Sequence, residues 1–444
     1  MAIDNKDKKV LKSSIEREQN ELACSAEREK IKGSKNLNVP PLRFPEFNGE
    51  WEKCKISDLL DFYSTNSLSW EQLEYDTNAM MNLHYGLIHV GLPTMIDLAK
   101  DKLPNIKEGN MPKNFEMCKE GDVAFADASE DTNEVAKTVE FFKLAGKNVV
   151  CGLHTIHGRD NKHKTVVGFK GYAFLSATFH NQIRRIAQGT KIYSISTKNF
   201  SECYIGLPSK PEQTKIATLL RLIDERIATQ NKIIEDLKLL KSAIIDHIFN
   251  NEVLSFRKRM HLSDVATKIT QKNTNNHVSN VLSNSANQGI IPQSEVFDRE
   301  IANEDNTSNY FVISQNDFVY NPRKSATAPY GPINRYNGRT NGVISPLYLC
   351  FRSHNIDVEY LGWYFKSDSW YKYVYQNGDT GVRHDRVSIK DEIFFSMPLF
   401  IHNADEQIEI AKRLNKIESF VKLEEQYLFL LESQKLYLLQ QIFI

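Results

Sequence analysis

The chain contains the segment EQTKIATLLRLIDERIATQNKIIEDLKLLKSAIIDHIF at residues 212–249 and a second copy, EQIEIAKRLNKIESFVKLEEQYLFLLESQKLYLLQQIF, at residues 406–443. The two copies align without a gap at an offset of 194 residues. Identical pairs include Glu212/Glu406, Gln213/Gln407 and Phe249/Phe443. A segment of this length that recurs without an insertion predicts one structural element used twice.

Both copies have the pattern of a long amphipathic helix. Apolar residues recur at alternating steps of four and three over about five heptads, which is typical of a coiled coil. Polar residues interrupt each seam at matching places. We therefore expect the two helices to pair with each other in an antiparallel arrangement. The alternative is a pair of structural helices that have no wider function. The predicted helix-pair seam consists of Ile223, Ile227, Gln230, Ile234, Leu237, Lys241, Ile417, Val421, Glu424, Leu428, Leu431 and Lys435.

The beginnings of both helices carry their own signals. Pro211 suits a first helical turn, where its missing N–H is not needed. Glu212 would then lie near the positive end of the helix dipole. Before the second helix, Asn403 or Asp405 can cap the first turn.

The duplication extends upstream of the helices. Residues 193–195 (Tyr-Ser-Ile) match 387–389 (Val-Ser-Ile), and 205–208 match 395–398 as apolar strands that end in proline. Residues 121–125 resemble 316–320, and 56–59 resemble 262–265. We therefore expect two globular modules of about 150 residues, a usual domain size, with a shared framework and different loops.

Composition limits the possible classes of protein. No apolar run among the 444 residues approaches the roughly 18–20 needed to span a bilayer, and the charged beginning lacks the apolar core of a signal peptide. The six cysteines occur singly, which predicts reduced thiols in the cytoplasm and neither a disulfide framework nor a zinc site. A formal net charge of zero disfavours a non-specific polyanion binder but allows local basic patches.

No segment predicts catalysis. Gly146-Lys147 lacks the upstream glycine of a phosphate-binding loop. Residues 321–324 (Asn-Pro-Arg-Lys) begin like an amino-methyltransferase site, but Arg323 and Lys324 replace its proline and aromatic residue, which favours a basic loop after a strand. His154, His157 and His163 could be metal ligands, but a loop rich in polar donors is the preferred interpretation, and we predict no catalytic and no metal-binding residue.

Several loops combine basic, amide and aromatic side chains, which can contact base edges and phosphates. For each of these loops, an ordinary solvated loop is the alternative interpretation. However, one basic loop lies just before the repeated Ser-Ile pair in each half of the chain. The predicted DNA-binding residues are His154, Thr155, Arg159, Lys162, Arg184, Arg185, Lys191, Arg323, Lys324, Tyr330, Arg335, Arg339, Asn341, Arg383, His384 and Arg386.

In this combination of features, the chain resembles the specificity subunits of type I restriction-modification systems. Residues 42–51 (LRFPEFNGEW) look like the opening of a first target-recognition domain, and residues 205–217 look like the junction into a central conserved helix. Residues 405–407 (Asp-Glu-Gln) repeat that junction before a distal helix, without its proline.

The resemblance implies an α+β protein with two mixed α/β target-recognition domains, joined by two long antiparallel coiled-coil helices in a pseudo-two-fold repeat. The expected parts are a polar tail at 1–38, longer than is usual for the family; domain 1 at 39–207; a central helix at 208–250; domain 2 at 251–397; and a distal helix at 398–444.

The resemblance also implies a non-catalytic subunit whose two domains each read one half of a bipartite, asymmetric DNA target. Implied partners are double-stranded DNA, two methyltransferase subunits and motor-nuclease subunits. No cofactor would be bound by this chain, because its partners use S-adenosyl-methionine, ATP and magnesium. The competing hypothesis is a coiled-coil scaffold that binds other proteins; DNA binding that weakens with salt would distinguish the two.

Overall fold

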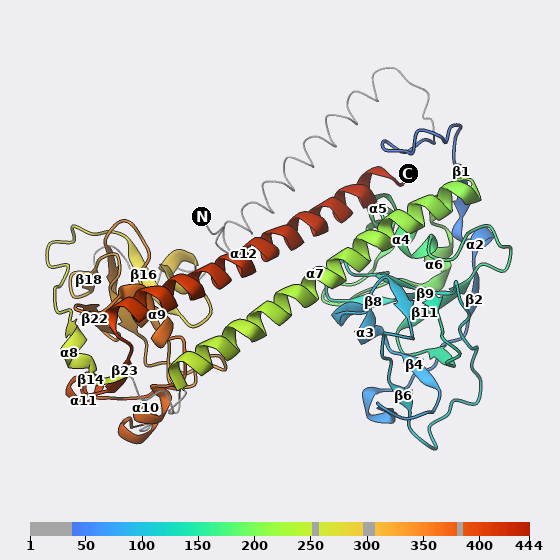
Figure 1. The fold of residues 1–444 in the computed structure, drawn as a ribbon. Helices are drawn as coiled ribbons and strands as arrows, with labels where there is room; N and C mark the ends of the chain where they lie inside the picture. Colours follow the sequence, from blue (N-terminus) through green and yellow to red (C-terminus); the bar gives the residue numbers. More distant parts are fainter. Residues whose placement is uncertain (1–37, 251–256, 296–306, 380–384) are drawn as a thin grey trace. The chain divides into compact units, whose positions relative to one another are not determined.

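The computed structural model describes residues 38–250, 257–295, 307–379 and 385–444 (Figure 1). The predicted tail therefore lies outside the described residues, apart from residue 38. The chain divides into two compact units. The first unit comprises Glu27–Lys232 and Gln426–Ile444, and the second includes Ile233–Glu425.

The first unit is built on two sheets. A five-stranded sheet has the order β2 (Asp61–Tyr63), β11 (Thr155–Arg159), β7 (Val123–Ala126), β9 (Thr138–Lys143) and β5 (Met95–Asp97). A four-stranded sheet has the order β10 (Val149–Cys151), β4 (Met81–Leu83), β6 (Asn105–Ile106) and β3 (Leu73–Glu74). Two small sheets pair β1 (Glu52–Lys55) with β13 (Tyr204–Leu207) and β8 (Ala128–Ser129) with β12 (Tyr193–Ser194). The helices are α2 (Ile56–Leu59), η1 (Trp70–Gln72), α3 (Tyr85–Val90), α4 (Lys170–Phe174), α5 (Ala177–Ile186) and α6 (Thr197–Ser201).

The five-stranded sheet is buried on both faces. Because successive side chains of a strand point to opposite faces, β7 supplies two cores. Val123 and Phe125 pack in a cluster with side chains of α4, α5 and α6, whereas Ala124 and Ala126 pack in a cluster with β4 and β10. The first unit is therefore layered as helices, sheet and sheet.

The second unit is also built on two sheets, each of four strands. One sheet has the order β15 (Ala266–Lys268), β22 (Leu349–Ser353), β19 (Phe318–Tyr320) and β20 (Ile333–Arg335). The other has the order β17 (Gly289–Pro292), β16 (Val281–Ser285), β21 (Gly342–Ile344) and β18 (Phe311–Ile313). β14 (Lys258–His261) pairs with β23 (Pro398–Ile401). The helices are α8 (Leu262–Val265), η2 (Gln293–Glu295), α9 (Val358–Tyr364), α10 (Tyr371–Asn377) and α11 (Asp391–Phe395).

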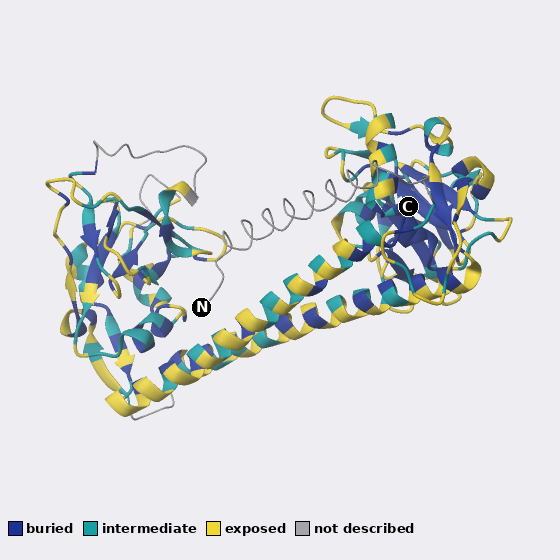
Figure 2. Ribbon diagram, turned by 90° about the horizontal axis from the view of Figure 1, so that it is seen from above, coloured by how far each residue is buried: buried dark blue, intermediate teal, exposed yellow. Residues whose placement is uncertain are grey.

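The two long helices are α7 (Lys210–Asn250) and α12 (Ala404–Gln441). Their amphipathic patterning is visible in Figure 2, where buried and exposed residues alternate along both. Every residue of the predicted seam is buried or half-buried, whereas Leu222, Leu239 and Leu430 beside it are more than half exposed.

The helices begin as their sequences predict. Pro211 lies in the first turn of α7. Asn403 caps α12, since its Oδ1 accepts from the Glu406 N–H at 3.0 Å, and the Glu406 carboxylate accepts in return from the Asn403 N–H at 3.2 Å. This reciprocal pair is a capping box, and it selects Asn403 rather than Asp405.

The repeated glutamines fasten each helix to its own unit in the same way. Gln213 Nε2 donates to the Pro208 carbonyl at 2.9 Å, and its Oε1 accepts from the Val166 N–H at 2.9 Å. Gln407 donates to the His402 carbonyl at 2.8 Å and accepts from the Asp357 N–H at 3.0 Å. Both side chains are buried, so these bonds satisfy polar groups that water cannot reach.

One sequence prediction about the strands is wrong. Residues 395–398 do not form a strand ending in proline: Phe395 ends α11, and β23 begins at Pro398. β13 at 204–207 and β23 at 398–401 are related by the offset of 194. The position of the second strand therefore follows the gapless alignment of the helices and not the match between the two prolines. The mixed α/β class, in contrast, is confirmed.

Candidate nucleic-acid interface

The second unit places three predicted basic residues around one hollow of about 330 Å³. Arg323 and Lys324 follow β19, and Arg386 follows the segment 380–384, which is not described. Arg323 pairs with Arg386 as a β-bridge, and the Lys324 N–H donates to the Asp385 carbonyl at 2.8 Å. These backbone bonds hold together two loops that are about 60 residues apart in sequence.

An acidic side chain lies between the two arginines. Asp385 Oδ2 is 3.9 Å from the Nε of Arg323 and also 3.9 Å from the Nε of Arg386. At this distance the contact is weak, so it leaves the two guanidinium groups able to bind an anion.

Asparagines form the rear wall of this hollow. Asn321 Nδ2 donates to the Asn284 carbonyl at 2.9 Å, and the buried Asn284 Nδ2 donates to the Val319 carbonyl at 2.7 Å. Asn334 donates to Asn284 Oδ1 at 2.7 Å. A fixed amide network of this kind positions the adjoining loops, and guanidinium groups beside it have the donor fork that guanine and phosphate accept.

The other predicted residues of the second unit that the structure describes do not line this hollow. Arg335 is largely buried and its Nη1 lies 2.6 Å from Glu359, so its charge is already compensated. Tyr330 packs its ring against Tyr371 at a centroid distance of 5.1 Å. Arg339 and Asn341 are exposed, whereas Arg383 and His384 lie outside the described residues.

The first unit presents an aromatic row near the equivalent strand ends. Trp70 and His84 lie 4.4 Å apart by ring centroids, His84 and Tyr85 4.8 Å, and Tyr85 and His154 5.2 Å. His154 is exposed, has a φ of +54° in the turn between β10 and β11, and its Nδ1 lies 3.1 Å from Asp127. Burial lowers the pKa of His84, helped by the nearby His154, which favours a neutral ring that can stack.

Two predicted DNA contacts of the first unit are buried. Thr155 is 5% exposed, and its hydroxyl donates to the Gly152 carbonyl at 2.6 Å. Arg159 is 7% exposed: Nε and Nη2 form a fork on Asp122 at 2.9 and 2.8 Å, and Nη1 donates to Glu116 at 2.6 Å. Burial opposes the charge of Arg159, but the bonds to Asp122 and Glu116 outweigh it and raise the pKa. Both side chains form their hydrogen bonds inside the unit, where they support the sheet.

The other predicted residues of the first unit are exposed. Lys162 Nζ donates to the Asp58 carbonyl at 3.0 Å. Arg184 and Arg185 lie in the last turn of α5, where Arg184 Nη1 donates to Asn133 at 2.8 Å, and Lys191 lies in the loop before β12. The structure therefore brings together no single basic cluster from these four residues.

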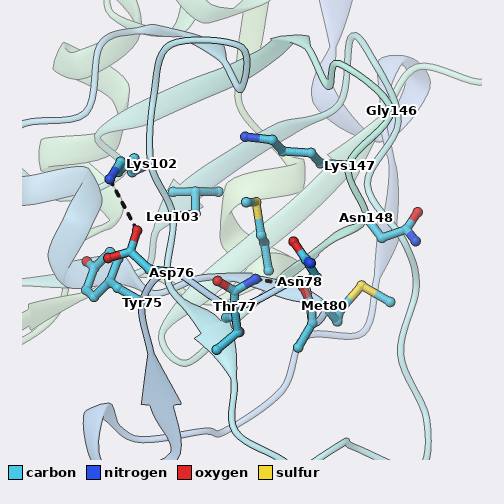
Figure 3. A pocket seen from close by; sticks show the side chains of 13 residues that line it. Tyr75, Asp76, Thr77, Asn78, Met80, Lys102, Leu103, Gly146, Lys147 and Asn148 are labelled. Atoms are coloured by element: carbon cyan, nitrogen blue, oxygen red, sulfur yellow. Dashed lines mark hydrogen bonds and ion pairs between the residues drawn. The ribbon is translucent and has the colours of Figure 1, made fainter.

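Another hollow of the first unit, about 380 Å³, is polar but contains none of the predicted DNA-binding residues (Figure 3). Lys102 and Asp76 form an ion pair of 3.2 Å at its edge. The Lys147 ammonium donates a hydrogen bond to the Leu98 carbonyl at 2.7 Å. Its neighbour Gly146 does not belong to a phosphate-binding sequence motif.

The sequence did not single out several residues of these surfaces. Asn284 and Tyr348 line the hollow of the second unit, and Trp70 and Tyr85 belong to the aromatic row of the first. The sequence gives no signal for Asn284, because β16 reads Val-Leu-Ser-Asn-Ser and the burial of this amide is decided by folding. Trp70 was marked only by being an aromatic residue in a polar segment.

Comparisons with known proteins agree with this geometry. Residues 101–239 match the family model described as the type I restriction modification DNA specificity domain. A search of curated proteins finds no match. No helix among the described residues is long and apolar enough to cross a membrane.

Two solved structures have a similar fold. The S subunit of a type I restriction-modification system from M. genitalium is 15% identical, with 91% of this chain and 99% of that chain covered and a TM-score of 0.50. A chain from a structural study of complex assembly and conformational transition of the type I R-M system is 14% identical, with 90% and 98% covered and a TM-score of 0.53.

Basic and aromatic side chains at the strand ends of a mixed α/β fold are of the kind that can contact nucleic acid. The family match is more particular: residues 101–239 are similar to the type I restriction modification DNA specificity domain, and the two solved structures share the fold of the chain.

Proposed function

We propose that the two units each read one half of a bipartite, asymmetric DNA target. The observation that carries this proposal is a pair of equivalent frameworks with unlike loops. Asp122 accepts a two-bond fork from Arg159, and Asp317 accepts the same fork from Arg352 at 2.7 and 2.8 Å. Asp122 and Asp317 also accept from the N–H of Lys119 and Ser314 at the turn before their strands.

The loops that follow these shared strands differ. In the second unit the strand β19 leads into Arg323 and Lys324, whereas in the first unit β7 leads into Asp127 beside His154 and Tyr85. Arginine and lysine suit guanine and phosphate, whereas an imidazole beside aromatic rings offers different donors and apolar surface to the base edges. The loops after β19 and β7 thus carry different side chains on the same framework. This difference supports two different half-sites and therefore an asymmetric target.

The helices α7 and α12 would form the antiparallel coiled coil of the proposed pseudo-two-fold repeat, with the domain boundaries predicted above. Equivalent ion pairs support this pairing: Lys241 lies 2.7 Å from Glu418, and Lys435 lies 2.6 Å from Asp224. The offset of 194 residues relates the two lysines and also relates the two carboxylates. Each of the seam's lysines thus meets a partner of opposite charge on the other helix, which would specify register.

Exposed apolar side chains on the helices support docking of methyltransferase subunits. They include Ile408, Phe420, Leu423, Leu239 and Leu240 in the second unit, and Leu222, Leu430 and Tyr437 in the first. Apolar surface of this extent on long helices is typical of a protein-binding site. The methyltransferase partners would supply S-adenosyl-methionine, and motor-nuclease partners ATP and magnesium, so this chain would bind no cofactor for the reaction.

Methylome sequencing tests the proposal. The full chain is co-expressed with its cognate methyltransferase subunit in cells that lack other adenine methyltransferases. We expect one split motif, with methylated adenine in each half and an unread spacer of constant length. A continuous motif, or a palindromic split motif, would contradict two unlike readers, and the absence of any motif would contradict the function in DNA modification.

A further inference from the structure

Two cysteines and a histidine converge in the interior of the first unit. Cys118, Cys151 and His157 have exposed fractions of 5%, 1% and 0%, and one potential ligand atom from each lies within 4.8 Å of the others. The two Sγ atoms are 3.6 Å apart. The residues are distant in sequence, so no short motif marks them.

The imidazole of His157 is oriented by a carboxylate. Its Nε2 lies 2.7 Å from Asp122 Oδ2, and Asp122 is itself held by the guanidinium fork of Arg159. Because the ionised Asp122 only accepts, Nε2 carries the proton. The other ring nitrogen, Nδ1, is buried and has no hydrogen-bond partner in the part of the chain that the structure describes. A neutral imidazole in this tautomer has its free lone pair on Nδ1, and a carboxylate on the opposite nitrogen is the usual support of a metal-binding histidine.

We propose that Cys118, Cys151 and His157 bind one divalent cation of the zinc class through two thiolate sulfurs and Nδ1. Two sulfurs at about 2.3 Å from a tetrahedral ion lie roughly 3.8 Å apart, close to the separation seen here. Thiolate and imidazole ligands together select zinc over magnesium or calcium. Two thiols lose their protons on binding, and the resulting two negative charges balance the cation. A water molecule or another small ligand completes the fourth position.

The proposed ion would join the two sheets of the first unit. Cys151 ends β10 in the four-stranded sheet, His157 lies in β11 of the five-stranded sheet, and the Cys118 N–H donates to the Val149 carbonyl at 2.8 Å. The turn between Cys151 and His157 contains His154, which is exposed. If the proposed function holds, the ion fixes the turn that presents this side chain to DNA.

The second unit shows what the same position looks like without metal ligands. The strand pair Ala124 and His157 corresponds to Val319 and Cys350, and the pair Met117 and Val150 corresponds to Val312 and Val343. The positions that follow, occupied by Cys118 and Cys151 in the first unit, hold Ile313 and Ile344 in the second, where they pack in an apolar cluster with Cys350. Apolar packing of Ile313 and Ile344 against Cys350 fills this position in the second unit, where the first unit holds three ligand-forming side chains.

Metal analysis of the full chain tests the site. The protein is purified reduced and without chelators, and its metal content is measured by mass spectrometry. We expect about one zinc per chain. Cys118→Ser and Cys151→Ser should each weaken zinc retention by roughly tenfold or more, since even the loss of a supporting residue has effects of that size. Cys203→Ser and Cys350→Ser remove buried thiols outside the cluster and are matched controls that should retain the metal.

Cobalt substitution in the unaltered chain gives a readout that does not depend on whether the variants fold. Reduced wild-type protein titrated with Co²⁺ should develop the charge-transfer band of cobalt–thiolate ligation and saturate at one equivalent, and the metal should protect Cys118 and Cys151 from alkylation. Absence of both zinc and the cobalt band would overturn the proposal. A disulfide between Cys118 and Cys151 in metal-free isolated protein would also overturn it, in favour of redox pairing. Neither result bears on the methylome experiment, so the two proposals can fail separately.

Discussion

At the scale of single residues, burial separates basic side chains that support the fold from those that can meet DNA. Arg159 and Arg184 are both arginines in polar surroundings in the sequence. Arg159 is enclosed because Asp122, 37 residues away, accepts its guanidinium inside the sheet, and sequence spacing cannot reveal that partner. Arg184 remains exposed at the end of α5.

Arg159→Ala should therefore destabilise the first unit. It leaves the carboxylate of Asp122, whose side chain is 1% exposed, buried beside His157 without its main counter-charge. Removing one partner of a buried pair costs about 3–5 kcal/mol in the free energy of unfolding. Urea denaturation measures the change. Arg184→Ala, as the control, should shift stability by no more than about 0.5 kcal/mol; equal stability of both variants would contradict the supporting role of Arg159.

Arg323→Ala combined with Arg386→Ala should relax recognition of one half-site and leave the other intact. The two guanidinium groups line one hollow of the second unit, and each good fork on a base is worth about 1–3 kcal/mol of discrimination. Methylome sequencing reads the outcome as degeneracy confined to one half of the motif. Arg413→Ala is the matched control, because that exposed arginine pairs only with Glu409 on its own helix among the described residues. Degeneracy in both halves would contradict a unit-specific contact.

At the scale of elements, the repeated helices and turns were predictable from the sequence. Elements whose conformation depends on residues distant in sequence were not. The similar residues 56–59 and 262–265 both form a single helical turn, and Gln213 and Gln407 both bridge a helix start to its unit. The strand expected at 395–398 failed because apolar residues ahead of a proline fit a helix end as well as a strand. The candidate site was only partly predictable, since Asn284 and Trp70 gain their roles from strands and rings brought near by folding.

The ion pair between Lys241 and Glu418 should make the second unit's helix pair sensitive to acid. Burial would raise the pKa of Glu418, but the hydrogen bond from Lys241 and the charge of Lys366 outweigh it and lower the pKa. A lowered folded pKa contributes stability above the ordinary glutamate value, and this stability is lost as pH falls through the folded pKa. Glu418→Gln should flatten that acid-side loss in thermal unfolding followed from neutral to acidic pH.

Lys241→Ala and Lys435→Ala give a matched comparison of the two equivalent pairs. Each lysine is about one-fifth exposed and each pair joins α7 to α12, so each variant should lose about 1 kcal/mol or less in the free energy of unfolding. Double-mutant cycles with Glu418→Gln and Asp224→Asn isolate the coupling. A zero coupling energy in both cycles would show that these lysines do not hold the register.

At the scale of the whole molecule, the parts of the chain that repeat and the parts that differ have separate roles. The repeated parts are the two long helices, their glutamine anchors and the carboxylate–guanidinium forks, which are structural. The unlike parts are the strand-end loops, where the candidate DNA contacts lie. Under the proposed function, changes in one set of loops would alter one half of the target while the framework stays constant.

Deleting one heptad from each long helix tests whether the helices set the spacer. Removing 233–239 from α7 and 419–425 from α12 keeps both apolar seams in phase, because each loses one whole repeat. Seven residues correspond to about 10 Å of helix, or roughly three base pairs at 3.4 Å each. The methylome should then show a shorter spacer between unchanged half-site sequences, and inserting a heptad into each helix should lengthen it. An unchanged spacer at full activity would mean that the helices do not measure the distance between the half-sites.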